Sequence, residues 1–298
     1  MKFGQEFPLD ILVLLKMTTE LSQWINTEEI TLINTVDRQW LISVFKRHNG
    51  FPKLEQIWNL MDEAWDILKC DPNIIDARVA SFYAHPVWLL NGLFIEQHSQ
   101  SIENRKYFRD WVVKHSPKRV GELGGGFGSL ARAVGAALPA TTIEVIEPHP
   151  HPIAISRSDK TTNVRYIPSM VGNYDVLLAT DVFEHVHDPL QLVYETSQHL
   201  KIGGRYFIAN SFFPVIRCHL PQTFHYRHSW DAALQAMGLI PGEKIAYGRS
   251  YIRSGSLNLE AARLIEVKSR NLWRFIQYLP NRMAQILSKF AVSIFIRM

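Results

Sequence analysis

The chain has 298 residues, of which 47% are hydrophobic and 20% are charged. This composition is typical of a globular protein with a buried core, and it excludes an intrinsically disordered chain. The two cysteines, Cys70 and Cys218, are too few for a disulfide framework and form no C-x-x-C pair. We therefore expect free thiols in a cytoplasmic protein and no metal ion.

Charge is distributed unevenly along the chain. Residues 1–200 contain 18 Lys and Arg against 24 Asp and Glu, whereas residues 201–298 contain 14 against 4. A basic segment of this kind is either a solvated face or a surface that meets a negatively charged ligand or partner. The sequence leaves both interpretations open.

Residues 1–115 are predicted to form a helical N-terminal subdomain. In LEQIWNLMDEAWDILK, apolar residues recur every three or four positions, which places them on one face of a helix. The two tryptophans of this stretch, Trp58 and Trp65, are therefore interpreted as core residues. The apolar run within FPLDILVLLKM is too short to span a membrane and is interpreted as the first core helix.

In residues 116–270, short apolar runs alternate with amphipathic stretches. KRVGEL, TIEVIEP, NVRYIP, YDVLLATD and GRYFIANS are predicted strands, and SLARAVGAAL, PLQLVYETSQHL and SWDAALQAMGL are predicted helices. EKIAYGRS and EAARLIEVK are expected to supply a final pair of strands. This alternation predicts an α/β domain, with a doubly wound, mostly parallel seven-stranded sheet and helices on both faces.

A glycine-rich loop lies between the first predicted strand and the helix after it. RVGELGGGFGSLARA contains Gly124, Gly125, Gly126 and Gly128 where the chain leaves the strand. Glycines allow a ligand to lie against bare backbone, and helix N–H groups attract a carboxylate or phosphate. The next strand ends at Glu147, nineteen residues after Gly128, where an acid is placed to bind a ribose diol. The pattern predicts a nucleotide-like cofactor.

The order of the motifs points to a family. The pattern E-x-G-x-G-x-G from Glu122 resembles the first motif of class I S-adenosylmethionine-dependent methyltransferases. YDVLLATDVFEHVHDPLQLV resembles the fourth-strand segment of their small-molecule, natural-product tailoring branch, and HLKIGGRYFIAN is similar to the turn and fifth strand that follow. The resemblance covers residues 105–268. It implies a Rossmann-like fold, S-adenosylmethionine as cofactor and methyl transfer, expected to be O-methylation in secondary metabolism.

The resemblance also implies roles for individual residues. The glycine loop would hold the methionine part of the cofactor, and Glu122 would orient that loop or meet the ammonium group. Glu147 would bind the ribose hydroxyls, and Asp181 would lie beside the methionine part, followed by two residues close to the adenosyl group. Relatives carry an acid after the third strand for the adenine, whereas YIPSM ends in a serine and a methionine. The predicted cofactor set is Glu122, Gly124, Gly126, Gly128, Glu147, Ser169, Met170, Asp181, Val182 and Phe183.

The acceptor site is expected in NSFFPVIRCHLPQTFHYRHSW, which follows the fifth strand and mixes aromatic and basic residues. His225 or His228 is a candidate general base for a hydroxyl acceptor, and Arg227 is a candidate clamp for a carboxylate. A second wall is SFYAHPVWLLNG, through which the helical subdomain would cap the acceptor. The alternatives are a surface loop for the first segment and core packing for the second. The candidate acceptor-binding residues are Arg217, Tyr226, Tyr83 and His85.

The sequence does not decide between a hydroxyl and a carboxylate as the methyl acceptor. The basic last third of the chain slightly favours an anionic small molecule or small peptide. A NAD-dependent oxidoreductase, an RNA or protein methyltransferase and a non-catalytic partner with the same fold remain alternatives. Ser129 stands where a dinucleotide-binding loop requires its third glycine, and no basic stretch is interleaved with stacking aromatics as nucleic acid would require. We expect neither nucleic acid nor a membrane among the partners.

Residues 271–298 are predicted to form an amphipathic helix. NLWRFIQYLPNRMAQILSKFAVSIFIRM allows three interpretations. The helix docks on its own domain or on a sister subunit in a homodimer, it lies on an anionic membrane surface, or it leads to a further C-terminal domain. The first interpretation is favoured.

Overall fold

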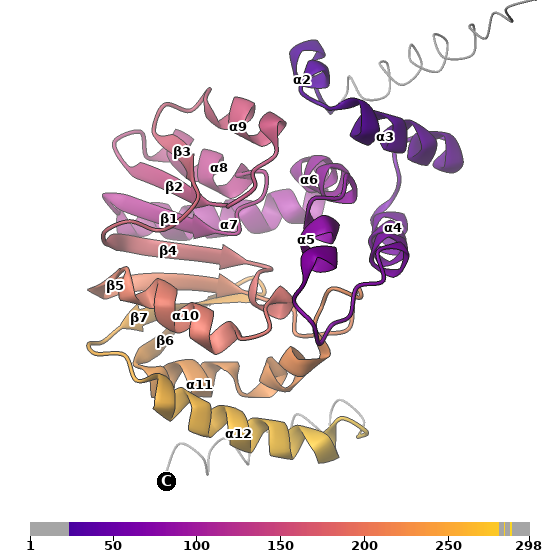
Figure 1. Ribbon diagram of the computed structural model, residues 1–298. Helices are drawn as coiled ribbons and strands as arrows, with labels where there is room; N and C mark the ends of the chain where they lie inside the picture. Colours follow the sequence, from indigo (N-terminus) through magenta and orange to yellow (C-terminus); the bar gives the residue numbers. More distant parts are fainter. Residues whose placement is uncertain (1–23, 280–282, 284–286, 288–298) are drawn as a thin grey trace, which may run out of the picture.

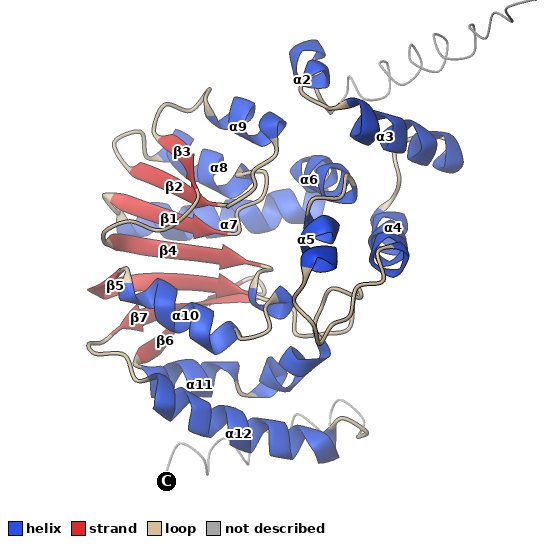
Figure 2. Cartoon of the chain, in the orientation of Figure 1, coloured by secondary structure: helices blue, strands red, loops and turns tan. Residues whose placement is uncertain are grey.

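Seven strands form a single sheet with helices on both faces (Figure 1, Figure 2). The computed structural model describes residues 24–279 together with Met283 and Leu287. The strand order is β3-β2-β1-β4-β5-β7-β6, in which β1 to β5 are parallel, β7 is antiparallel to β5, and β6 is antiparallel to β7. This confirms the predicted Rossmann-like, mostly parallel sheet. The strands are β1 (Arg119–Leu123), β2 (Thr142–Ile146), β3 (Val164–Ile167), β4 (Tyr174–Thr180), β5 (Leu200–Ala209), β6 (Leu239–Ile245) and β7 (Gly248–Arg253).

Two helical layers bury the two faces of the sheet. Along β4, Val176 and Leu178 belong to the core beneath α7 and α8, whereas Leu177 and Ala179 belong to the core beneath α10, α11 and α12. Successive side chains of a strand point to opposite faces, so this strand is apolar on both sides. The helices are α7 (Ser99–His115), α8 (Ser129–Ala137), α9 (Pro152–Ser158), α10 (Pro189–Gln198), α11 (Trp230–Met237) and α12 (Leu259–Ile276), with short 3₁₀ helices η1 (Phe183–His185) and η2 (Pro221–His228).

The helical N-terminal region has a core of its own and lies at the carboxyl ends of the strands (Figure 1). That core continues into the sheet domain through Phe127 of the glycine loop, Ile153 of α9 and Cys218 of the segment after β5. The region therefore covers the edge of the sheet at which α/β proteins bind ligands. Its helices are α2 (Thr27–Thr31), α3 (Thr35–His48), α4 (Leu54–Ile67), α5 (Ala77–Tyr83) and α6 (Val87–Gln97).

The C-terminal part of the fold differs from the prediction. EAARLIEVK, expected as a strand, lies within α12, because Ala262, Ile265 and Ser269 recur at helical spacing on its buried face. The partner of β7 is instead β6, which begins at Leu239. The expected domain boundary at residue 270 falls inside this continuous helix. Most of the predicted C-terminal helix, beyond residue 279, lies outside the described residues.

One buried carboxylate links four neighbouring strands. Glu144 of β2 has 1% of its side chain exposed and accepts hydrogen bonds from Arg119 of β1 (2.7 Å), Arg165 of β3 (2.5 Å) and the Tyr174 hydroxyl of β4 (2.7 Å). Burial acts to raise the pKa of Glu144, but the hydrogen bonds from Tyr174, Arg165 and Arg119 outweigh it and hold that pKa below the ordinary value.

In the described part of the chain, no helix is both long and apolar enough to cross a membrane.

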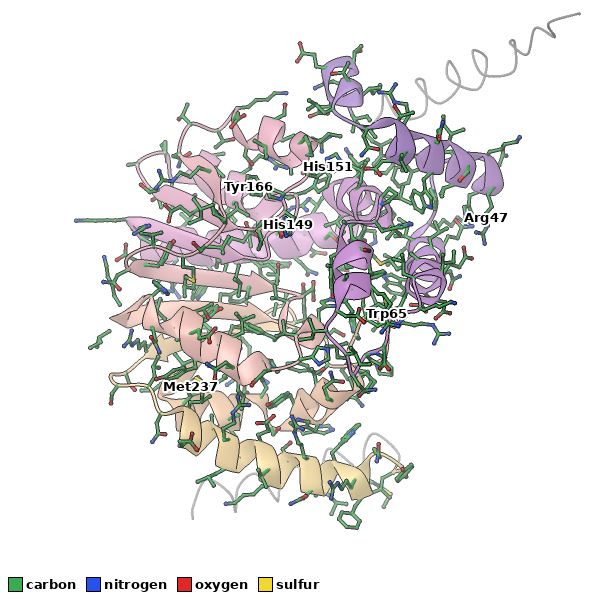
Figure 3. All side chains as sticks on the ribbon, viewed as in Figure 1. Arg47, Trp65, His149, His151, Tyr166 and Met237 are labelled. Carbon is green, nitrogen blue, oxygen red and sulfur yellow. The ribbon has the colours of Figure 1, made fainter. Side chains whose placement is uncertain are left out.

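We expect Glu144→Gln to lower the free energy of unfolding by about 2 kcal/mol at neutral pH, because the amide carries no charge for its cationic partners. Since the folded pKa is lowered, this stabilisation is present above the ordinary value of 4.5 and is lost as the pH falls through the folded pKa. Urea unfolding at several pH values measures it. The control is Glu63→Gln, which breaks the exposed pair with Arg47 (labelled in Figure 3) and should have a much smaller effect. A difference that persists in acid would contradict this account.

Candidate functional site

The loop after β1 leaves bare backbone at the carboxyl edge of the sheet. Gly124, Gly126 and Gly128 all have positive φ angles, of 61°, 49° and 63°. A Cβ built at Gly126 would meet no atom within 4 Å, so that a side chain there would project into open space. Glycine leaves this space to a ligand that lies directly against the main chain. The loop therefore fits the amino-acid end of a nucleotide-like cofactor.

Glu122 supports this loop from below. It is 2% exposed, and its carboxylate accepts a hydrogen bond of 3.0 Å from the Ala131 N–H in the first turn of α8. A Cβ at Gly125 would lie 2.9 Å from the Glu122 carboxyl carbon, which shows how closely the loop rests on it. Burial raises the pKa of Glu122 to about 7. Two roles were predicted for Glu122, and these contacts fit the first of them, which is to orient the loop.

Glu147 follows β2 and reaches the same loop. Burial raises its pKa, and hydrogen bonds from the backbone N–H groups of His149 and Gly126 partly offset that effect. His149 and His151 lie between the strand ends and the helical region (Figure 3), where the His151 ring stacks at 6.1 Å on Phe127. A half-buried carboxylate beside the glycine loop is in the position to accept hydrogen bonds from the two hydroxyls of a ribose.

Asp181 lies at the end of β4 in an unusual backbone conformation. Its φ angle is +53°, which a non-glycine residue rarely adopts, and its N–H donates to the Ala209 carbonyl at 2.7 Å. The Tyr247 hydroxyl donates to its carboxylate at 2.8 Å, and burial raises the pKa of Asp181. Val182 is half-buried and packs over Gly124. The ends of β1 and β4 thus meet, as the resemblance implies.

The predictions for the remaining cofactor residues have different outcomes. Ser169 is exposed, and Met170 is half-buried against the core on the α10 side. Their contact with the cofactor stays a prediction. Phe183 lies in the core. Its side chain is completely buried, with its ring 5.5 Å from Trp230 and 6.3 Å from Tyr206. The start of η1 turns this ring into the core, away from any ligand at the edge of the sheet.

Two predicted acceptor residues hold the structure together instead. The Nδ1 atom of His85 accepts a hydrogen bond from the Val87 N–H at 3.2 Å, and its ring meets Trp40 edge-on, so that His85 caps α6. Arg217 is exposed and pairs with Asp66 of α4 at 3.1 Å, which ties the segment after β5 to the helical region.

His225 is also not where a catalytic base is needed. It is 4% exposed beneath α12, where its Nδ1 atom lies 3.0 Å from the Ser269 hydroxyl. Burial and the nearby Arg270 lower the pKa of His225 to about 4. The residue next to it, Tyr226, is 1% exposed and packs with Phe212 in the core. The helical packing of residues 259–276, which the sequence did not predict, is the reason His225 is covered.

A cavity of about 300 Å³ lies beside the ends of β5 and β7. Arg249 in its wall pairs with Asp231 at 3.4 Å, and the Arg227 guanidinium donates to the Phe212 carbonyl at 3.0 Å. The cavity reaches Tyr247, whose hydroxyl is bonded to Asp181. The structure thus brings three of the predicted residues, Tyr226, Arg227 and His228, together in the wall of one cavity. The cavity walls include Tyr226, Arg227, His228, Lys244, Tyr247 and Arg249.

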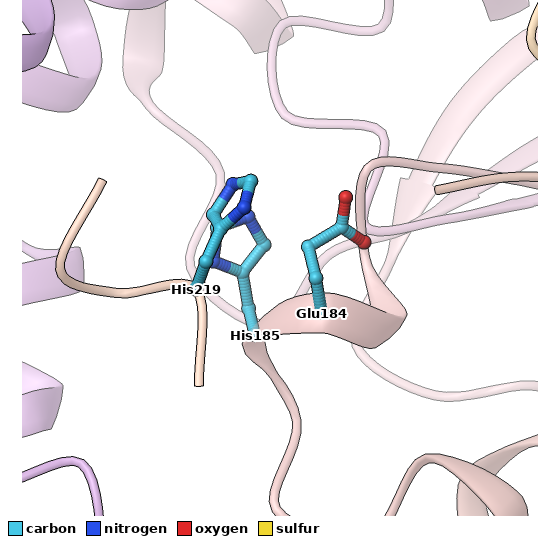
Figure 4. A group of neighbouring side chains, drawn as sticks. All are labelled: Glu184, His185 and His219. Atoms are coloured by element: carbon cyan, nitrogen blue, oxygen red, sulfur yellow. The ribbon is translucent and has the colours of Figure 1, made fainter. Parts of the chain in front are cut away.

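Sequence reasoning did not find the group of Glu184, His185 and His219 (Figure 4). One donor atom from each side chain lies within 4.8 Å of the others. His185 Nδ1 is 3.0 Å from the Cys218 carbonyl and His219 Nδ1 is 2.7 Å from the Phe213 carbonyl. A carbonyl only accepts, so both Nδ1 atoms carry the hydrogen, and in an uncharged ring Nε2 is then the basic nitrogen.

The electrostatics of this group keep both imidazoles uncharged. Burial and the neighbouring His219 lower the pKa of His185 to about 3, and burial lowers the pKa of His219. Burial and Asp181 raise the pKa of Glu184, whose carboxylate accepts from the Ser211 N–H at 2.7 Å. Neutral imidazoles and carboxylates are also ligands of transition metals, so these three side chains are candidate metal ligands. The sequence analysis predicted no metal ion. The segment YDVLLATDVFEHVHDPLQLV contains two members, Glu184 and His185, but only the fold brings His219 beside them.

The helical region supplies an aromatic wall at the same place. Tyr83 of α5 is 41% exposed and stacks on Trp88 at 5.3 Å, and both rings meet His185 edge-on, at 6.4 and 6.2 Å. Tyr83 therefore brings the helical region into contact with His185 of η1, and its role in acceptor binding stays a prediction.

Comparisons with known proteins agree with this geometry. Residues 122–206 match a family model described as a methyltransferase domain. Ubiquinone biosynthesis O-methyltransferases of Chelativorans sp. and Azotobacter vinelandii are 28% and 27% identical over 43% and 46% of this chain, and the matches cover 58% and 63% of those proteins. The chain thus matches less than two thirds of the length of these relatives.

A solved structure supports the fold. An O-methyltransferase family protein from Burkholderia thailandensis superposes with a TM-score of 0.51 at 15% identity, covering 68% of this chain and 71% of that one. This superposition and the strand order show a methyltransferase-like fold, within which residues 122–206 match the methyltransferase domain.

Proposed function

We propose that this protein transfers a methyl group from S-adenosylmethionine to a hydroxyl oxygen of a small molecule. The observation that carries the proposal is the pair of neighbouring imidazoles, His185 and His219, whose Nδ1 atoms bond backbone carbonyls and whose Nε2 atoms are therefore the basic nitrogens. The curated relatives are named as O-methyltransferases, which supports oxygen as the acceptor atom.

The residues around the glycine loop would bind the cofactor, which supplies a methyl group already activated on a sulfonium. The bare backbone at Gly126 would face the amino-acid end, and Glu147 would accept hydrogen bonds from the ribose hydroxyls. Tyr247 orients the Asp181 carboxylate between the loop and the cavity. These groups need only fix the methyl in line with the incoming oxygen.

His219 is the stronger candidate for the general base. It comes from the segment after β5, is 8% exposed, and is oriented by the bond from its Nδ1–H to Phe213. An uncharged imidazole accepts the hydroxyl proton as the oxygen attacks the methyl group. The acceptor would lie against the wall formed by Tyr83 and Trp88, which favours a planar molecule.

The cavity beside β5 favours an anionic group on the acceptor, and it supports a carboxylate as the second candidate. Arg227, Lys244 and Arg249 line it, with Asp231 as the acidic neighbour. A carboxylate acceptor needs no base, only cations that fix it and exclude water. Arg227 is held by the Phe212 carbonyl and by the Phe213 ring 3.8 Å away, so its charge stays in this wall.

Incubation with methyl-labelled S-adenosylmethionine and a panel of aromatic compounds that differ only in a hydroxyl, carboxylate or amino group tests the proposal. We expect label in methyl ethers, detected by mass spectrometry, and more of it when the hydroxylated compound also bears an acidic group. Label on nitrogen, or methyl esters without ethers, would overturn hydroxyl methylation.

Glu147→Ala should weaken binding of S-adenosylmethionine about tenfold, because a hydrogen-bonded contact to a charged group is worth about 1.5–3 kcal/mol. Isothermal calorimetry gives the dissociation constant without any acceptor. Glu195→Ala, an exposed acid of α10, is the control and should bind like the natural protein. Equal affinities for all three proteins would remove Glu147 from the site.

His219→Asn should lower kcat by roughly a hundredfold with the cofactor dissociation constant unchanged. Because burial lowers the pKa of His219, the uncharged base is present at neutral pH, and the rate should fall only below the ordinary histidine value of 6.5. The pH profile of kcat on the best hydroxyl acceptor measures both effects. The control is His199→Asn, which changes a histidine that bonds the Gly172 carbonyl. A rate that already halves above that value would contradict the assignment.

A further inference from the structure

A line of apolar side chains runs along the exposed face of α12. Leu264, Val267, Phe275 and Tyr278 are 65%, 57%, 75% and 83% exposed. At 3.6 residues per turn, the helical positions Leu264, Val267 and Phe275 fall within a stripe about 80° wide, which also contains the exposed Glu260 and Asn271. Tyr278 follows the end of the helix at Ile276. The residues that hold the helix on its domain, such as Ile265 and Ile276, lie on the opposite face and are buried. The stripe is therefore not what fixes α12 to the protein.

Positive charge flanks this stripe. Lys268 lies on one side of it along the helix and Arg274 on the other, by the same helical spacing. Arg270 is half exposed and pairs with Glu266. After Glu266 the sequence contains six Lys and Arg and no Asp or Glu up to residue 298. Of these cations, Lys268, Arg270 and Arg274 belong to α12 itself.

Charge decides which partner fits this surface. In a two-fold dimer the same patch would meet itself, so the basic flanks of one copy would face those of the other. Nucleic acid would satisfy the cations but leave Leu264, Val267 and Phe275 without apolar partners. A bilayer with anionic lipids satisfies both, because headgroups attract the cations while the apolar side chains enter the interface.

In contrast to the expectation from the sequence, which included no membrane among the partners, we propose that α12 is a docking surface for an anionic lipid bilayer. Leu264, Val267, Phe275 and Tyr278 would enter the interface, and the cations beside them would contact the headgroups. No helix of the described residues spans a membrane, so the helix would lie on the surface. The proposal does not depend on which acceptor is methylated.

Sedimentation of the full chain with vesicles tests it. We expect binding to phosphatidylcholine vesicles that contain a third of phosphatidylglycerol, little binding to phosphatidylcholine alone, and weaker binding in high salt. Phe275→Glu combined with Tyr278→Glu should reduce binding at least about tenfold, because two apolar side chains no longer enter the interface.

The matched control carries the same change on another surface. Val36 and Ile67 are 71% and 77% exposed, and Val36→Glu combined with Ile67→Glu should bind vesicles like the natural protein. All variants should keep the thermal unfolding and cofactor affinity of the natural chain, since the changed residues lie outside the core. The proposal fails if the natural protein ignores anionic vesicles or if both double variants lose binding equally. It also fails if light scattering shows a dimer that only the α12 variant breaks.

Discussion

The position of the glycine loop depends on two side chains that hold it from opposite sides. Glu122 lies beneath the loop and caps α8, and the ring of Phe127 leaves the loop and enters the core of the helical region. It fits there because α6 has Gly92, where any side chain would collide with the ring. The cofactor loop is consequently shaped by both parts of the fold, and neither part alone would fix it.

Charges reinforce the same junction. Glu96 of α6 accepts a hydrogen bond from the Ser129 hydroxyl at the start of α8 and pairs with Arg132 and Arg157. Arg157 of α9 also pairs with Glu29 of α2 at 2.9 Å. These groups are largely buried, so breaking one pair would leave an uncompensated charge. The helical region is therefore held over the strand ends in one orientation, which gives the aromatic wall at Tyr83 a fixed place.

The segment after β5 positions two different chemical groups with one stretch of backbone. The carbonyl of Phe213 accepts from His219, and the neighbouring carbonyl of Phe212 accepts from Arg227. The free imidazole nitrogen and the cationic cavity are thereby fixed relative to each other. This arrangement suits an acceptor with a hydroxyl at one point and an anionic group at another, and it explains why the segment is rich in both aromatic and basic residues.

The sequence by itself determined the features that depend on local pattern. Hydrophobic periodicity and the glycine loop predicted the sheet, and the spacing to Glu147 predicted the cofactor crevice, because strand, turn and helix signals act within a few residues. Tertiary structure alone decided which polar residues face that crevice. His219 and Glu184 meet only through the fold, whereas His225, an equally good candidate by type, is covered by α12. Residue type specifies the chemistry a side chain can perform, but packing against distant elements decides its exposure, its pKa and its partners.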